Sequence, residues 1–246
     1  EMENSKDLIS VLWSGADILR SKMDANEYKD YLLGIVFYKY LSDSFLIKVY
    51  DLIYDERPEN LMVALDAYRE ALEDESAGEL QEQLRSEFHY VIEPELTYTC
   101  FADEARNNAF QREQLQKAFN NIEQSDPLFA DLFTDIDLYS NRLGTGDQKQ
   151  SDTIANLILE IDKADLLDSD AEILGNAYEY LIGQFASETG KKAGEFYTPQ
   201  AVSKILTKIA IAGQEDKKGL SVYEIKTIRL IQRYDTHRQQ NMFKTA

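Results

Sequence analysis

The stretch DANEYKDYLLGIVFYKYLSDSF, residues 24–45, decides the fold of this chain. Its apolar residues follow one another at helical spacing on nearly every side, and the pattern continues past Phe45. A helix that is apolar nearly all round is buried, so we expect this one to be the central helix of a bundle. Asp24 with Glu27 three positions later has the form of a capping box, which predicts that the helix begins here.

Helical spacing also dominates outside this stretch. Apolar residues recur three and four positions apart through most of the 246 residues, whereas strand patterns are nearly absent. The sequence therefore predicts a mostly α fold. Prolines and turn residues separate the further expected helices, at residues 7–22, 61–72, 80–91, 103–122 and 151–161. Because the turn-rich GTGDQ follows at residues 144–148, we expect residues 1–145 to form an N-terminal helical domain.

Composition narrows the class of protein. The 26 Lys and Arg residues face 45 Asp and Glu residues, which gives a net charge of −19. Such a surface repels a phosphate backbone, so the chain is a poor stand-alone DNA binder. The longest apolar run, residues 31–41, is about half the roughly 20 residues of a membrane span. Without a signal-like segment, and with Cys100 as the single cysteine, we expect a cytoplasmic protein with no membrane partner and a buried, unreactive thiol.

The histidines carry no metal prediction. His89 and His237 lie far apart in the sequence and lack supporting Cys or Asp spacing. We expect His89, between Phe88 and Tyr90, to be a packed or surface side chain.

A second informative stretch is GEFYTPQAVSKIL, residues 194–206. Thr198 suits a helix N-cap and Pro199 the first helical position. The N-H groups of a helix N-terminus can receive a carboxylate or phosphate. Phe196 and Tyr197 offer faces for a flat base or a sulfonium cation, and Glu195 can pair with an ammonium group. The corner thus suits a small zwitterionic ligand with an aromatic base, or it is simply a helix start with aromatics packed beneath it.

The helices around this corner follow from the same rules. Ser169 with Glu172 has the form of a capping box for a helix that ends near Gly190. After the corner, the helical spacing predicts one buried apolar stripe, made of Val202, Ile205, Leu206 and Ile209.

Three stretches resemble one family, the modification (M) subunits of type I restriction-modification systems, which are N6-adenine DNA methyltransferases using S-adenosylmethionine. They are LWSGADILRSKMDANEYKDYLLGIVFYKYLSD at residues 12–43, LGNAYEYLIGQFA at residues 174–186, and residues 194–206. The resemblance implies that residues 146–223 begin a Rossmann-like methyltransferase domain. It also implies that the cofactor's methionyl end contacts Glu195, Phe196, Tyr197, Thr198, Pro199 and Gln200.

Other motifs of that family do not follow. LSVY at residues 220–223 is similar to the family's first parallel strand, but residues 220–246 contain no glycine for the Gly-rich turn. The family's Asn-Pro-Pro-aromatic motif, which holds the flipped adenine, is also missing, since no two of the four prolines are adjacent. We therefore expect a truncated Rossmann-like domain with no catalytic residue and an incomplete cofactor site, and a chain that does not methylate DNA as it stands.

The last segment changes in composition. Residues 224–246 hold five Lys or Arg and two Asp or Glu, a net charge of +3 that leaves −22 for residues 1–223. This change predicts an atypical basic tail produced by truncation or a frame shift. Alternatively, the tail is an ordinary amphipathic helix with an apolar face of Ile225, Ile228, Leu230 and Ile231.

For the function, the resemblance implies an M subunit that works with a specificity subunit, a restriction subunit and a second M subunit, and that meets DNA only through the full complex. Two other readings stay open. The chain can be a non-catalytic helical assembly module that docks other subunits, or an unrelated helical protein in which the GEFYTP motif is a coincidence.

Overall fold

The computed structural model describes residues 2–164, 202, 205–206, 208–209 and 212. The chain divides into two compact units, Glu1–Thr189 and Gly190–Ala246. Within residues 2–164 the regular structure is entirely helical, with no strand, as the sequence predicts. In this part of the chain the α-helices are α1 (Met2–Arg20), α2 (Ala25–Tyr54), α3 (Leu61–Glu73), α4 (Ala77–Phe88), α5 (Tyr98–Arg106), α6 (Arg112–Ser125) and α7 (Asp147–Asp162).

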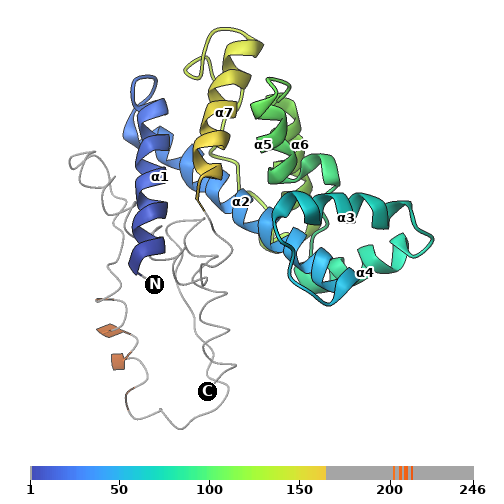
Figure 1. Ribbon diagram of the computed structural model, residues 1–246. Helices are drawn as coiled ribbons and strands as arrows, with labels where there is room; N and C mark the ends of the chain where they lie inside the picture. Colours follow the sequence, from blue (N-terminus) through green and yellow to red (C-terminus); the bar gives the residue numbers. More distant parts are fainter. Residues whose placement is uncertain (1, 165–201, 203–204, 207, 210–211, 213–246) are drawn as a thin grey trace. The chain divides into compact units, whose positions relative to one another are not determined.

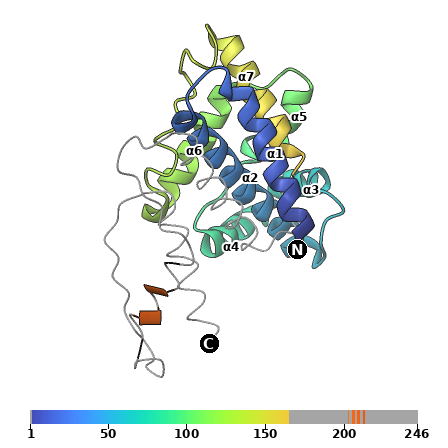
Figure 2. The same cartoon turned by 90° about the vertical axis from the view of Figure 1, so that its left-hand side faces the viewer.

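Helix α2 is the central helix of the first unit, as its sequence predicts. It packs against α1, α3, α4, α5 and α7, and all six residues 31–36 are buried. Helix α1 packs against α2 and α7, and Figure 2 shows it running beside α2. Figure 1 shows α3 and α4 side by side near the C-terminal end of α2. Because its neighbours cover most of its surface, the helix can be apolar on nearly every side.

The start of α2 is predicted correctly, but the capping box is not. Asp24 has an extended backbone directly before the helix, yet its side chain accepts no capping hydrogen bond. The carboxylate of Glu27 pairs instead with Arg142, 115 residues away in the sequence. The local sequence pattern thus predicts where the helix starts. It does not predict the capping box, because the Glu27 side chain forms a tertiary ion pair instead.

The prediction of a single helix at residues 103–122 is wrong, because the structure has two helices there, α5 and α6. The turn between them includes Asn108, whose φ of 55° lies in the left-handed region that asparagine tolerates. On the far side of this turn, the Gln111 N-H donates to the Gln114 side chain at the start of α6. The helical spacing of apolar residues continues across the turn, so periodicity alone does not show the break.

A close approach between α2 and the loop before α7 depends on Gly34. A Cβ atom added to Gly34 would lie 2.1 Å from the Cδ1 atom of Ile136. Ile136 and the neighbouring Phe133 are both buried, 5% and 3% exposed. The absent side chain at Gly34 therefore makes room for the loop to pack directly on the central helix.

Helix α7 begins at Asp147, two residues after the predicted end of the helical domain at residue 145. It packs against α1, α5, α6 and α2, so it shares a core with the helices that precede it. Its buried residues include Ile154, Leu157, Ile158 and Ile161, each 0% exposed. None of the helices that the structure describes is long and apolar enough to cross a membrane.

Candidate functional site

The predicted cofactor-contacting residues, 195–200, lie outside the described residues, as do the predicted capping box at Ser169 and Glu172 and the basic tail at residues 224–246. Their predictions from the sequence therefore stay predictions.

The apolar stripe predicted to be buried after residue 200 is exposed. The residues are helical, as expected. Their exposed fractions are 44% for Val202, 57% for Ile205, 56% for Leu206 and 68% for Ile209. Helical spacing identifies an apolar face, but its burial depends on a surface that packs against it.

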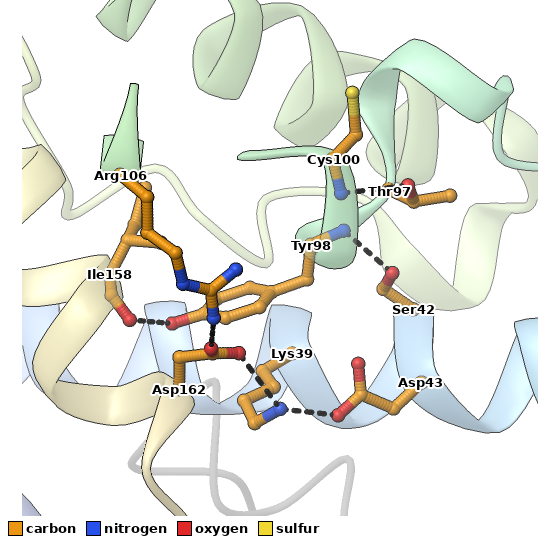
Figure 3. Close-up of polar contacts among 9 residues, drawn as sticks. All are labelled: Lys39, Ser42, Asp43, Thr97, Tyr98, Cys100, Arg106, Ile158 and Asp162. Atoms are coloured by element: carbon orange, nitrogen blue, oxygen red, sulfur yellow. Dashed lines mark hydrogen bonds and ion pairs between the residues drawn. The ribbon is translucent and has the colours of Figure 1, made fainter. Parts of the chain in front are cut away.

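A buried ion pair, with two less buried charges beside it, lies where α2, α5 and α7 meet (Figure 3). The Lys39 ammonium and the Asp43 carboxylate, one turn apart on α2, pair at 2.6 Å and are 3% and 1% exposed. The Lys39 Nζ atom also lies 3.7 Å from Oδ1 of Asp162, the last residue of α7. The second oxygen of Asp162 pairs with Arg106 at the end of α5.

Tyr98 completes this group, the charged cluster. Its hydroxyl donates to the Ile158 carbonyl on α7 at 2.8 Å, and its backbone N-H donates to Ser42 Oγ on α2 at 2.8 Å. The Lys39 ammonium lies over its ring, 5.0 Å from the centroid. Burial raises the pKa of the Tyr98 hydroxyl well above its ordinary value, and the nearby carboxylates of Asp162 and Asp43 raise it further. Tyr98 is therefore a permanent hydrogen-bond donor that ties α5 to α7.

An open cavity of about 410 Å³ lies beside the charged cluster. Lys39, Asp43, Arg106 and Asp162 line it, together with residues 60–62 at the start of α3. These four side chains balance two cations against two carboxylates, and each is bound to another member of the cluster. Such a paired arrangement positions helices, because each of these four charges is held by another member of the cluster.

Cys100 and His89, which could in principle react or bind a metal, form no reactive site within residues 2–164. Cys100 is buried, as predicted, and burial raises the pKa of its thiol, which keeps it protonated and unreactive. His89 is a surface side chain, 56% exposed, at the C-terminal end of α4. In the part of the chain that the structure describes, no group of three or more His, Cys, Asp or Glu residues could hold a metal ion.

The sequence gives one signal of the charged cluster. Lys39 and Asp43 are spaced one turn apart within a helix that is otherwise apolar, and charged residues are rarely buried unless they are paired. Their local pairing follows from that spacing. The partners from α5 and α7 do not, since Asp162 is more than a hundred residues away.

Known family models match most of the chain. A family model described as "HsdM N-terminal domain" matches residues 8–161, and this match ends within the last turn of α7. A second family model, described as "N-6 DNA Methylase", matches residues 169–227.

Similar proteins come from bacteria and archaea. The chain is 30% identical over 220 residues to the type I restriction enzyme MpnII methylase subunit of Mycoplasma pneumoniae, covering 83% of this chain and 39% of that protein. It is 31% identical over 209 residues to the MjaVIII methylase subunit of Methanocaldococcus jannaschii, covering 82% of this chain and 31% of that protein.

The solved structure of the type I restriction-modification system methyltransferase subunit from Streptococcus thermophilus is similar in fold and sequence. It aligns with a TM-score of 0.80 and 50% identity, over 88% of this chain and 46% of that one. The helical unit built around α2 is thus a known domain. The chain belongs to the family of type I restriction-modification methylase subunits. It spans between 31% and 46% of the length of these three relatives.

Proposed function

We propose that this chain corresponds to the N-terminal part of an M subunit, and that the intact subunit methylates adenine N6 in DNA with S-adenosylmethionine. The observation that carries the proposal is the likeness to the Streptococcus thermophilus methyltransferase subunit, with 50% identity over 88% of this chain. The match of residues 169–227 to the N-6 DNA methylase model supports it. The partners we propose are a specificity subunit, a restriction subunit and a second M subunit, with DNA bound only by the full complex.

Within this proposal, residues 195–200 contact the cofactor. S-adenosylmethionine would supply the methyl group, and Glu195, Phe196, Tyr197, Thr198, Pro199 and Gln200 would hold its methionyl end. Support comes from Thr198 and Pro199, which suit the start of a helix, where N-H groups receive a carboxylate. We further propose that the chain as given transfers no methyl group, because its sequence lacks the Gly-rich turn and adjacent prolines.

Calorimetric titration of S-adenosylmethionine into the purified chain tests this site. If residues 195–200 retain binding, heat is measured that disappears in Tyr197→Ala and Thr198→Ala. Tyr54→Ala is the matched control, since Tyr54 is a 48% exposed tyrosine at the end of α2. A flat titration with the unaltered chain contradicts residual binding at this corner.

For the domain limits, we propose that the helical domain extends through α7 and that the methyltransferase domain begins after it. The packing of α7 on α1 and α5 supports this limit over one at residue 145. Limited proteolysis tests it. A stable fragment that includes Asp162 is expected, whereas a stable fragment ending near residue 145 contradicts the proposal.

A second candidate function is non-catalytic assembly with another subunit. The exposed apolar face of Val202, Ile205, Leu206 and Ile209 favours it. The apolar residues of α2 do not serve this purpose, because most are buried within the chain. Co-purification with a specificity subunit of a type I system tests the idea. Ile205→Asp and Ile209→Asp are expected to abolish capture, and Lys208→Gln is expected to retain it. Capture that survives both Asp variants contradicts this role for the face.

A further inference from the structure

We propose that Asp162 is a positioning residue that holds the last turn of α7 against α2 and α5, and so fixes the point where the chain leaves the helical domain. Asp162, Lys39 and Arg106 together form what we name the Asp162 latch. The proposal concerns the helical domain alone and is independent of cofactor binding at residues 195–200.

The geometry of one carboxylate carries the argument. Its Oδ1 atom lies 3.7 Å from Lys39 Nζ on α2, while its Oδ2 atom pairs with Arg106 on α5 (Figure 3). The Asp162 side chain is 22% exposed and that of Lys39 is 4% exposed, so water screens the inner contact weakly. One residue of α7 therefore links the C-terminal ends of α5 and α7 to the middle of α2.

The position of Asp162 opposes local helix preference. A carboxylate at a helix C-terminus interacts unfavourably with the helix dipole, and the last turn of α7 contains no basic residue. Neutralising Lys39 does not require Asp162, because Asp43 already pairs with it at 2.6 Å. The contribution that Asp162 alone makes is the connection of α7 to the other two helices.

The backbone hydrogen bonds that follow α7 span short stretches of sequence. The Lys163 N-H donates to the Glu160 carbonyl at 3.3 Å, and the Ala164 N-H donates to the Ile161 carbonyl at 3.0 Å. Both bonds have the three-residue spacing of a tightened helix end, which is weaker than the α-helical bond. The latch also lies at a junction, since one family model ends at residue 161 and the next begins at residue 169.

The neighbouring cavity allows the latch to open locally. Arg106 and Asp162 both line this open space of about 410 Å³, so their contact borders open space and is not enclosed by the core. Ile161, which is 0% exposed, also holds this turn in the core. Loss of the Asp162 contacts should therefore make local opening of the turn easier without unfolding the domain.

Hydrogen exchange measured by mass spectrometry on the full chain tests the latch. In Asp162→Asn, amides of residues 161–164 should exchange roughly 10- to 100-fold faster, the range expected for a lost charge-assisted hydrogen bond. Amides of residues 154–157, in the middle of α7, should keep their rates. Glu160→Gln is the matched control, because Glu160 lies in the same turn and pairs with the exposed Lys163.

A conservative variant separates positioning from general stability. Asp162→Glu retains the carboxylate, so it should restore slow exchange at residues 161–164 relative to Asp162→Asn. The proposal is overturned if Asp162→Asn leaves these amides unchanged, if it accelerates all of α7 equally, or if Asp162→Glu gives no rescue.

Discussion

Replacing Lys39 by Met should destabilise the helical domain more than removing any exposed charge. The Lys39 ammonium is buried between Asp43 at 2.6 Å and Asp162 at 3.7 Å. Methionine keeps the length and apolar stem of the side chain but removes its charge. The Asp43 carboxylate, 1% exposed, then stays in the core without its cation and close to a second carboxylate.

The expected loss of stability in Lys39→Met follows from the burial of the Lys39–Asp43 ion pair. Removing one partner of a buried ion pair costs about 3–5 kcal/mol, because the remaining charge is desolvated without compensation. Replacing both partners by apolar groups costs much less, since no charge is left behind. We therefore expect Lys39→Met to cost about 4 kcal/mol, and Lys39→Met/Asp43→Leu to recover about 2 kcal/mol or more of that loss.

Urea unfolding followed by helical circular dichroism measures these free energies in all four members of the cycle. Lys163→Met is the control, because its side chain is 63% exposed and its pairing with Glu160 contributes little. A Lys39→Met variant within about 1 kcal/mol of the unaltered chain would refute the view that this buried pair is a high-cost element of the core.

Three further predictions concern stability. Gly34→Val should cost roughly 2 kcal/mol or more, because the valine side chain would overlap Ile136. Gly78→Ala has open space around it and should be neutral or stabilising by up to about 1 kcal/mol. Thermal unfolding distinguishes the two variants, and equal effects contradict the close packing at Gly34. Tyr98→Phe should cost about 1 kcal/mol in urea unfolding by removing one buried hydrogen bond, and no loss argues against that bond. Burial, and next the charge of Asp137, raise the pKa of Tyr31 from 10.0 to about 12. The neutral hydroxyl therefore adds to the free energy of unfolding below pH 10, and this contribution is lost as the pH rises to about 12. Tyr31→Phe should reduce the fall of the unfolding free energy over this range, and an unchanged fall contradicts the raised pKa.

The positions of most helices follow from the sequence because burial is periodic. Residues 24–45 predict the buried central helix, since apolar residues there occupy nearly every side. The break between α5 and α6 was missed because the apolar spacing continues across it, while the turn depends on the backbone angle of Asn108. Periodicity reports which side faces the core, and single backbone angles decide where a helix ends.

Contacts between distant segments were not predictable. The spacing of Lys39 and Asp43 allows their local pairing, but the arrival of Asp162 and Arg106 depends on how α5 and α7 pack. Glu27 shows the same limit, since Arg142 from a remote loop takes the carboxylate that the sequence assigns to a capping box. The exposed face at residues 202–209 is a third case, because the pattern does not specify what covers an apolar face.

We propose that residues 1–162 form the helical domain of a methylase subunit. A chimera tests it most directly, with these residues replacing the matching part of the Streptococcus thermophilus methyltransferase subunit, to which the chain is 50% identical. Incorporation of labelled methyl groups into adenine is then measured with the chimera and with the parent subunit, each assembled with the other subunits of that restriction-modification system. We expect the chimera to transfer methyl groups within about tenfold of the parent rate. A chimera that folds and unfolds like the parent but transfers no methyl group contradicts it.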